Sequence, residues 1–217
     1  MSWQPLQWEP RFLAFLQQQM TLGGATDAAH DLAHVRRVVA AATRLAASEG
    51  ADMAVVGPAA WLHDCVIVPK NSPQRSQASR WAAETAVTFL RASQYPAQHL
   101  EAIAHAIVAH SFSAAIPPQT IEAKVVQDAD RLDALGAIGM ARAFMVGGAL
   151  ARPLYDEADP FCRQRPPDDA TATLDHFYTK LFKLPGTMQT AAGRAEAERR
   201  AAFMQTFLAQ LAAEIGG

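Results

Sequence analysis

Apolar residues recur at helical spacing along most of the chain. In the stretch from residue 28 to residue 49 they recur three and four residues apart, at Leu32, Val35, Val38, Val39, Ala42 and Leu45. The same spacing of apolar residues, together with the turn residues between them, predicts helices over residues 9–20, 28–49, 53–66, 74–93, 97–110, 121–145, 171–184 and 191–215. Sustained alternation of apolar and polar residues between turns, the pattern of strands, is missing from the sequence. We therefore expect an all-α fold, a single helical bundle of about seven to nine helices.

Capping residues and helix breakers refine these limits. Pro10 suits the first turn of its helix, Asp27 is suited to cap the second helix, and Gly50 to end it. The segment 147–169 is rich in Gly, Pro and Asp, which predicts a long loop or lid. No internal repeat of 20 to 50 residues is visible.

The expected domain organisation is simple. Residues 1–24 form an N-terminal helix and loop, and residues 25–215 form the main domain, with which that helix makes one compact unit. The glycines at 136 and 139 indicate a close approach of two helices within the main domain.

Composition narrows the range of partners and compartments. Half of the 217 residues are hydrophobic, and the net charge of -2 gives no basic surface for a nucleic-acid polymer or an anionic membrane. The two cysteines, Cys65 and Cys162, fit neither a disulfide framework nor a thiolate metal site. The N-terminus does not resemble a signal peptide, and no apolar run approaches about 18 residues. These features favour a cytoplasmic protein.

The pair His63-Asp64 is an electrostatic anomaly. It lies in the apolar run Ala59-Ala60-Trp61-Leu62-His63-Asp64-Cys65-Val66, where an unpaired buried carboxylate costs several kcal/mol. Asp64 therefore lies at an exposed helix end or faces a cation in the core.

Other ionisable residues cluster upstream and downstream of this pair. His30 and His34 are four residues apart, so they share a helix face. Three carboxylates, Asp128, Asp130 and Asp133, follow an apolar pair within six residues. On a helix Asp130 and Asp133 share a face with Val126 and Gln127, whereas Asp128 points elsewhere. At least one of these acids is expected to point inward.

Imidazole and carboxylate groups together bind divalent ions such as Mn, Fe, Co, Ni, Zn or Mg. The lack of thiolate ligands argues against a closed structural zinc site, and a mixed site commonly keeps positions open for water and substrate. A water bound to the ion has a lowered pKa and loses a proton to become a nucleophile, while the ion polarises a phosphoryl oxygen. Hydrolysis is the reaction that this chemistry favours.

Three segments resemble the HD superfamily of metal-dependent phosphohydrolases. Asp31-Leu32-Ala33-His34-Val35-Arg36-Arg37-Val38 is similar to the helix of that family's first histidine, and Ala60-Trp61-Leu62-His63-Asp64 to its name-giving doublet. Gln127-Asp128-Ala129-Asp130-Arg131-Leu132-Asp133-Ala134-Leu135-Gly136 is similar to the helix of its last aspartate. His110-Ser111-Phe112-Ser113, Arg152-Pro153-Leu154-Tyr155-Asp156 and the tail from Met188 to Met204 resemble a bacterial YedJ-like subgroup. The resemblance spans roughly residues 25 to 212.

The resemblance implies that His34, His63, Asp64 and Asp130 bind one divalent metal, with room left for water and a phosphate oxygen. It places Asp64 also to orient the water. His110 is interpreted as a group that contacts the substrate phosphate or a metal ligand. His105 is interpreted as structural or peripheral, and His30 as a surface residue or one that contacts a metal ligand.

Basic side chains near the site are candidates for phosphate contacts. Lys70 is proposed as a catalytic residue, and Arg37 and Arg75 could also supply positive charge, although each of the three is also explained as a solvated charge or a salt-bridge partner. Asp128 is the alternative to Asp130 as ligand and is otherwise a solvated or capping acid. Asp133 either bonds a ligand histidine or is a plain ion-pair partner.

One departure from the family bears on the substrate. Family nucleotidases carry a glutamate shortly after the doublet as the supposed general acid, whereas Cys65-Val66-Ile67-Val68-Pro69 contains no acid here. Either Asp64 or a water transfers the proton, or the leaving group needs little help. The missing glutamate therefore argues against activity as a nucleoside 5′-monophosphatase.

The function expected is a phosphomonoesterase or phosphodiesterase acting on a nucleotide or another small phosphate ester. The alternative is a non-catalytic, metal-dependent nucleotide sensor that responds through the 147–169 loop. A third hypothesis, a di-iron oxygenase, requires both His105 and His110 to reach a second metal. Homodimer formation is a further option that family resemblance leaves open.

Overall fold

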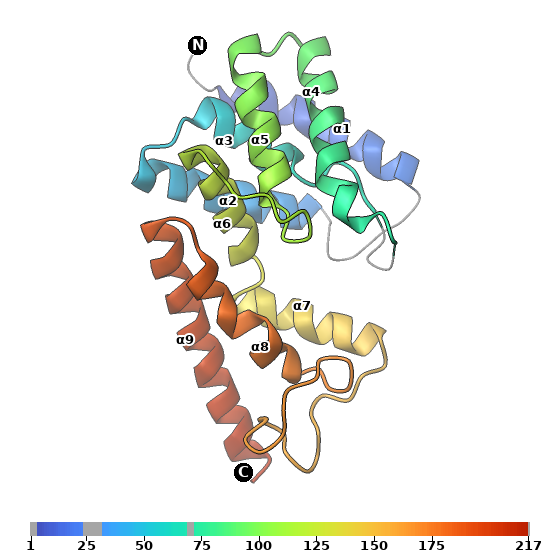
Figure 1. The fold of residues 1–217 in the computed structure, drawn as a ribbon, viewed down its shortest axis with the longest axis vertical. Coiled ribbons are helices and arrows are strands. Elements are labelled where there is room, and N and C mark those ends of the chain that lie inside the picture. Colours follow the sequence, from blue (N-terminus) through green and yellow to red (C-terminus); the bar gives the residue numbers. More distant parts are fainter. Residues whose placement is uncertain (1–3, 24–31, 69–71, 217) are drawn as a thin grey trace. The chain divides into compact units, whose positions relative to one another are not determined.

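The computed structural model describes residues 4–23, 32–68 and 72–216, and within these ranges every regular element is a helix. The α-helices are α1 (Pro5–Gly23), α2 (Leu32–Glu49), α3 (Met53–Leu62), α4 (Ala78–Ala92), α5 (Leu100–His110), α6 (Ile121–Leu132), α7 (Gly136–Ala149), α8 (Asp175–Thr179) and α9 (Ala191–Glu214) (Figure 1). Short 3₁₀ helices lie at η1 (Arg75–Gln77), η2 (Ala97–His99) and η3 (Leu181–Thr187). The prediction of an all-α fold with seven to nine helices is confirmed.

The chain divides into two compact units, Met1–Asp130 and Arg131–Gly217. The division expected between residues 24 and 25, and the single main domain after it, stay predictions. The start of the second helix, with Asp27 as its cap, lies outside the described residues.

The centre of the first unit is α3. Its residues from Ala54 to Leu62 are all buried, and it packs against α1, α2, α4 and α5. Asp52 caps its start, because the carboxylate Oδ1 accepts a hydrogen bond from the amide of Ala54 at 2.8 Å. The helix ends at Leu62, so the His63-Asp64 pair leaves the helix inside the core of this unit.

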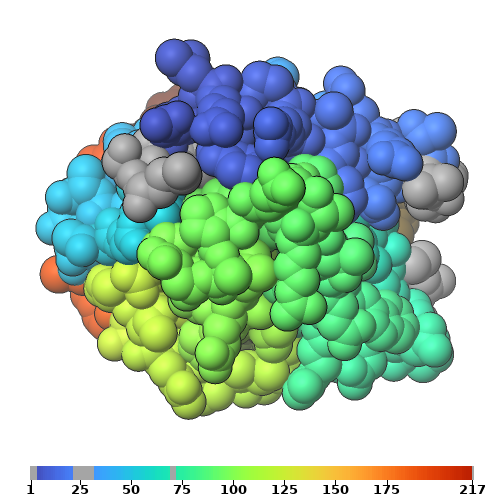
Figure 2. All heavy atoms as spheres, turned by 90° about the horizontal axis from the view of Figure 1, so that it is seen from above, coloured from blue at the N-terminus to red at the C-terminus, as the bar shows by residue number. Residues whose placement is uncertain are grey.

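Aromatic side chains hold α1 against the core. Phe12 lies 6.3 Å from Trp61 of α3 and 6.1 Å from Phe89 of α4 between ring centroids, and Phe15 stacks on Phe89 at 4.1 Å. Each such aromatic pair stabilises by about 0.5 to 1.5 kcal/mol beyond its buried area. Side chains of α1 accordingly lie beside those of α4 and α5 on one face of this unit (Figure 2).

A proline inside α3 leaves one backbone carbonyl without its helical donor. The carbonyl of Ala54 would accept from the residue four positions later, which is Pro58, and proline has no N–H. The hydroxyl of Tyr95 donates to this carbonyl instead, at 2.6 Å. A side chain from the loop after α4 thus supplies the bond that the helix cannot make.

Tyr95→Phe is expected to destabilise the protein by about 1 to 2 kcal/mol, because the buried carbonyl of Ala54 loses its donor. Urea unfolding followed by circular dichroism measures the change. In a Pro58→Ala background the helix supplies its own N–H donor to the Ala54 carbonyl. Tyr95→Phe should therefore lower the free energy of unfolding by clearly less in that background. Equal costs in both backgrounds would contradict this explanation.

The predicted helix over 121–145 is wrong as a single element. It is broken between Leu132 and Gly136, where Leu135 is extended and Gly136 has a φ of 71°, a left-handed conformation that favours glycine. A Cβ atom at Gly136 would lie 3.3 Å from the side chain of Arg200, so the expected close approach of a helix at this glycine is confirmed.

Two other predicted helices have different limits. α1 begins at Pro5, so Pro10 lies inside the helix and not in its first turn. The region predicted as one helix over 171–184 divides into α8 and η3. Because α7 continues to Ala149, the irregular segment runs from 150 to 174 instead of 147 to 169.

The second unit is built on α9, which packs against α7 and η3 (Figure 1). Phe144 of α7 contacts Phe177 and Phe207, with centroids 5.9 and 5.7 Å apart. Gly147 approaches the Thr173 side chain so closely that a Cβ atom would lie 2.2 Å from the hydroxyl oxygen. The glycine is therefore required where α7 meets the end of the irregular segment.

Charged side chains order the segment 150–174 from within. The Asp159 carboxylate accepts hydrogen bonds from the three successive amides of Arg163, Gln164 and Arg165. The Arg165 guanidinium donates twice to Asp175, at 2.5 and 2.7 Å, and the Asp175 side chain is completely buried. The predicted loop is thus a structured segment anchored to α8 by a bidentate ion pair.

This ion pair predicts acid sensitivity. Burial raises the pKa of Asp175, but the bonds from Arg165 and the Asp168 amide outweigh burial, so its pKa lies below the ordinary 3.8. The unfolded chain then takes up the proton first, and stability present above pH 3.8 is lost as the pH falls through the folded-state pKa. Urea unfolding at pH 5 and pH 3 should show this loss. Asp175→Asn should make the free energy of unfolding depend less steeply on pH between these two values.

Within the described ranges, no single helix has both the length and the apolarity needed to cross a membrane. The successive helices α6 and α7 meet that criterion only when they are taken together.

Candidate metal centre

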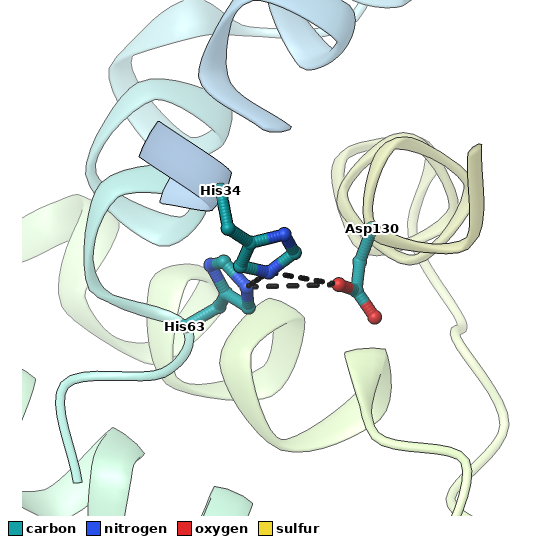
Figure 3. Close-up of side chains that lie close together, drawn as sticks. All are labelled: His34, His63 and Asp130. Atoms are coloured by element: carbon teal, nitrogen blue, oxygen red, sulfur yellow. Dashed lines mark hydrogen bonds and ion pairs between the residues drawn. The ribbon is translucent and has the colours of Figure 1, made fainter. Parts of the chain in front are cut away.

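Three residues from three helices meet inside the first unit. His34 lies on the second described helix, α2, His63 follows the last residue of α3, and Asp130 lies near the end of α6. The two Nε2 atoms are 3.4 Å apart, and Asp130 Oδ1 lies 3.4 Å from His34 Nε2 and 3.8 Å from His63 Nε2 (Figure 3). Residues nearly a hundred positions apart in sequence thus point their donor atoms at one place.

Asp64 and His110 extend this cluster on the other side of His63. Asp64 Oδ2 lies 3.6 Å from His63 Nε2, and Asp64 Oδ1 lies 3.5 Å from the Nε2 atom of His110, the last residue of α5. The cluster therefore contains two groups of three potential ligands, His34/His63/Asp130 and His63/Asp64/His110, each with its ligand atoms within 4.8 Å of one another. His63 belongs to both groups.

Backbone carbonyls set the orientation of two imidazoles. His63 Nδ1 lies 2.9 Å from the carbonyl oxygen of Ala60, and His110 Nδ1 lies 2.5 Å from that of Ile107. Because a carbonyl oxygen only accepts, each Nδ1 carries a proton. In neutral rings the Nε2 lone pairs then face the cluster, as metal ligation requires.

Burial decides the charge of His63. Its side chain is completely inaccessible to solvent, and burial lowers its pKa to about 4 against the raising effect of Asp64. At neutral pH the ring is uncharged, and the neutral imidazole is the form that binds metal ions.

The two neighbouring ionisable groups Asp130 and His110 are both stabilised in their charged forms. Burial raises the pKa of Asp130, but its hydrogen bond with His34 and the surrounding histidines outweigh burial and hold that pKa far below its usual range. For His110, burial lowers the pKa, yet contact with Asp64 outweighs it and the net shift is upward. An ionised Asp130 beside a neutral His63 is a donor set suited to a cation.

The spacing of the donors fits a metal ion. Ligand atoms about 2.0 to 2.2 Å from one ion lie about 2.8 to 3.6 Å from their neighbours in octahedral or tetrahedral arrangements. The donor atoms of His34, Asp64 and Asp130 lie 3.4, 3.6 and 3.8 Å from His63 Nε2, and His34 Nε2 lies 3.4 Å from Asp130 Oδ1. The Nε2 atoms of His34 and His63, 3.4 Å apart, would both be satisfied by a cation between them. Nitrogen and oxygen donors without thiolates suit the borderline and hard divalent ions.

A buried glutamine joins two of the elements that carry the cluster. Gln127 of α6 donates from its Nε2 atom to the carbonyl of Ala109 at 2.7 Å, directly before His110. Gln127 and Asp130 are three residues apart on one helix face, so this bond fixes the end of α5 against the turn that carries Asp130. The sequence placed Gln127 on the correct face but gave it no role.

The remaining predicted residues lie elsewhere. Lys70 and His30 are outside the described residues. Arg75 donates to the carbonyl of Val68 at 2.7 Å, while Arg37 is half-buried. His105 accepts a hydrogen bond at Nε2 from the amide of Gln119 at 3.0 Å and, in the part of the chain described, belongs to neither ligand group.

The two other acids of α6 and its following turn have distinct environments. Asp128 is completely buried, so its interpretation as a solvated acid is wrong: the helix turns it into the interior and not towards water. Asp133 receives a hydrogen bond from Arg142 at 2.5 Å, which makes it an ion-pair partner, one of the two alternatives kept open for it.

Buried imidazoles and partly exposed carboxylates from separate helices thus form a candidate metal centre inside a helical fold. Residues 31–135 match the family model described as HD domain. An uncharacterized protein of Bacillus subtilis, YpgQ, is 35% identical over 192 residues, covering 87% of this chain and 85% of YpgQ. The chain therefore belongs to the HD-domain family.

Solved structures agree with this assignment. A structure of B. subtilis YpgQ in complex with ADP has 34% identity and a TM-score of 0.68, covering 95% of this chain and 97% of that one. An HD-superfamily hydrolase from Bacillus thuringiensis has 32% identity and a TM-score of 0.72, covering 96% and 98%. The family resemblance inferred from the sequence is confirmed, while the YedJ-like subgroup stays a prediction.

Proposed function

We propose that this protein is a metal-dependent phosphohydrolase that acts on a nucleotide or another small phosphate ester. The observation that supports this most strongly is that potential ligand atoms of His34, Asp64 and Asp130 lie 3.4, 3.6 and 3.8 Å from the Nε2 atom of His63. These four residues would hold one divalent ion. A bound ion of this kind acidifies a water and polarises a phosphoryl oxygen.

The chain's own residues would prepare the site for that ion. The Ala60 carbonyl keeps the His63 ring in the tautomer that presents Nε2. Asp64 has two carboxylate oxygens with different neighbours, one near His63 and the other near His110. His110 would therefore hold Asp64 in one rotamer and stand beside the position of a substrate phosphate.

The absence of an acid in the stretch from Cys65 to Pro69 bears on the leaving group. Without a side chain there to protonate the departing oxygen, a leaving group that is already acidic is favoured. The relative YpgQ has been crystallised in complex with ADP, which supports a nucleotide as the ligand of this chain as well.

The test is a purified protein loaded with Mn²⁺ or Co²⁺ and assayed against aryl phosphates, a phosphodiester and nucleoside mono-, di- and triphosphates. Metal-dependent release of phosphate or pyrophosphate, abolished by chelation and restored by added metal, is the expected result. Inactivity of the metal-loaded protein across this panel would rule out the proposal.

A nucleotide sensor is the second candidate, because the complex of YpgQ with ADP records binding. Calorimetry separates the two: tight, metal-dependent binding of nucleotides that remain intact after prolonged incubation supports the sensor. Cytoplasmic location, assembly as a homodimer and the identity of the metal among Mn, Fe, Co, Ni, Zn and Mg stay predictions.

A further inference from the structure

An exposed aromatic side chain lies two residues beyond the cluster. Phe112 follows His110 by way of Ser111, and 74% of its surface is accessible to solvent. In the described part of the first unit, Leu6 on α1 is the other large hydrophobic residue with such exposure, at 94%. An exposed phenylalanine gains little burial energy from the fold, and its ring is accessible to a ligand.

The backbone around Phe112 is ordered by local bonds. Its carbonyl accepts a hydrogen bond from the amide of Ala115 at 3.3 Å, which closes a turn, and Ala115 has a φ of 52°. The hydroxyls of Ser111 and Ser113, on either side, lie 3.1 Å apart. These bonds hold the exposed ring on a short, defined turn.

The distance from the cluster is limited by the chain. Two residues span at most about 7 Å between Cα atoms, so the Phe112 backbone starts within that distance of His110. His110 is fixed in turn, because its Nδ1 bonds to Ile107 and Gln127 holds the preceding carbonyl. The turn is thus anchored directly to a residue that touches the metal ligand Asp64.

We propose that Phe112 is the platform on which the base of a bound nucleotide stacks while its phosphates face the His63-Asp64 cluster. This inference rests on the proposed function. A phenyl ring offers a flat apolar face that stacks on any base, so the platform favours nucleotides over base-free phosphates without selecting one base.

The test compares two ligands that differ only by the base. Binding of ADP and of ribose 5-diphosphate to the Mn²⁺-loaded protein is measured by calorimetry, together with hydrolysis of inorganic tripolyphosphate. We expect the wild type to bind ADP more tightly. Phe112→Leu should weaken ADP binding about tenfold and leave ribose 5-diphosphate binding and tripolyphosphate hydrolysis unchanged.

Two further variants make the result specific. Phe112→Tyr keeps the aromatic face and should retain ADP affinity, and Leu6→Ala removes an exposed apolar side chain on α1 and should change neither ligand. Equal binding of the two ligands by the wild type, or equal loss of both in Phe112→Leu, would overturn the platform while leaving the phosphohydrolase proposal standing. Failure of the wild type to bind or hydrolyse these phosphates, together with inactivity across the wider panel of phosphate esters, would instead reject the proposed function itself. A shift of oligomeric state in Phe112→Leu, with ADP affinity unchanged, would assign the ring to a protein interface and overturn the platform.

Discussion

His63→Asn is expected to leave a folded protein that no longer retains its divalent metal and loses metal-dependent hydrolysis by more than about 100-fold. Loss of groups that merely support a metal ligand costs 10- to 100-fold, and His63 itself belongs to both ligand groups. Its Nε2 atom lies within 3.8 Å of His34, Asp64 and Asp130 donors, and the shorter asparagine side chain cannot reach that position.

Metal content after dialysis, measured by mass spectrometry, and phosphate release report the two effects separately. His99→Asn is the matched control, because His99 lies on η2 and faces Asp52, with Nδ1 3.8 Å from its carboxylate. The control should keep metal and activity. A His63→Asn protein that binds as much metal as the wild type would show that the metal site has been assigned to the wrong residues.

Arg165→Met is expected to destabilise the protein by about 3 to 5 kcal/mol. The substitution removes both guanidinium bonds to Asp175 and leaves a completely buried carboxylate with two neutral donors, the Asp168 amide at 2.6 Å and the Cys162 thiol. Removing one partner of a buried pair is costly because the other charge stays in a medium of low polarity. Urea unfolding at pH 7 measures the loss.

Two comparisons distinguish the ion pair from other effects of losing an arginine. Arg163→Met removes an exposed guanidinium two residues away, which lies 5.6 Å from the ring of Phe161, and should cost less than about 1 kcal/mol. Adding Asp175→Asn to Arg165→Met should recover part of the stability, because a neutral amide is cheaper to bury than a carboxylate. A single Arg165→Met protein as stable as Arg163→Met would contradict the argument.

The helices were predictable from the sequence where apolar spacing and end signals agree. Gly50, with a φ of 69°, ends α2 where the sequence indicated. The prediction failed at 121–145, since apolar spacing continues through the break and Gly136 was read as a packing contact alone. The length of the irregular segment was also misjudged, because no local signal shows that α7 reaches Ala149.

The candidate site was predictable in its residue types but not in its geometry. The ordered histidines and aspartates indicated a mixed metal site, and the structure brings His34, His63, Asp64 and Asp130 together. The Ala60 carbonyl that orients His63 has no side-chain signature, so no sequence pattern could reveal it. The contact of His110 with Asp64 depends on how α5 packs against α3, which is a tertiary effect.

His63 also limits how many ions the cluster can hold. Its Nδ1 atom is committed to the Ala60 carbonyl, so the ring has a single lone pair, on Nε2, to share between the two ligand groups. One lone pair cannot coordinate two ions at once. An ion held by His34, His63, Asp64 and Asp130 would leave His110 and, at most, the second carboxylate oxygen of Asp64 for another ion, which is too few protein ligands for a stable second ion. We therefore expect a stoichiometry of one metal ion per chain, and elemental analysis finding two ions per chain would contradict this expectation.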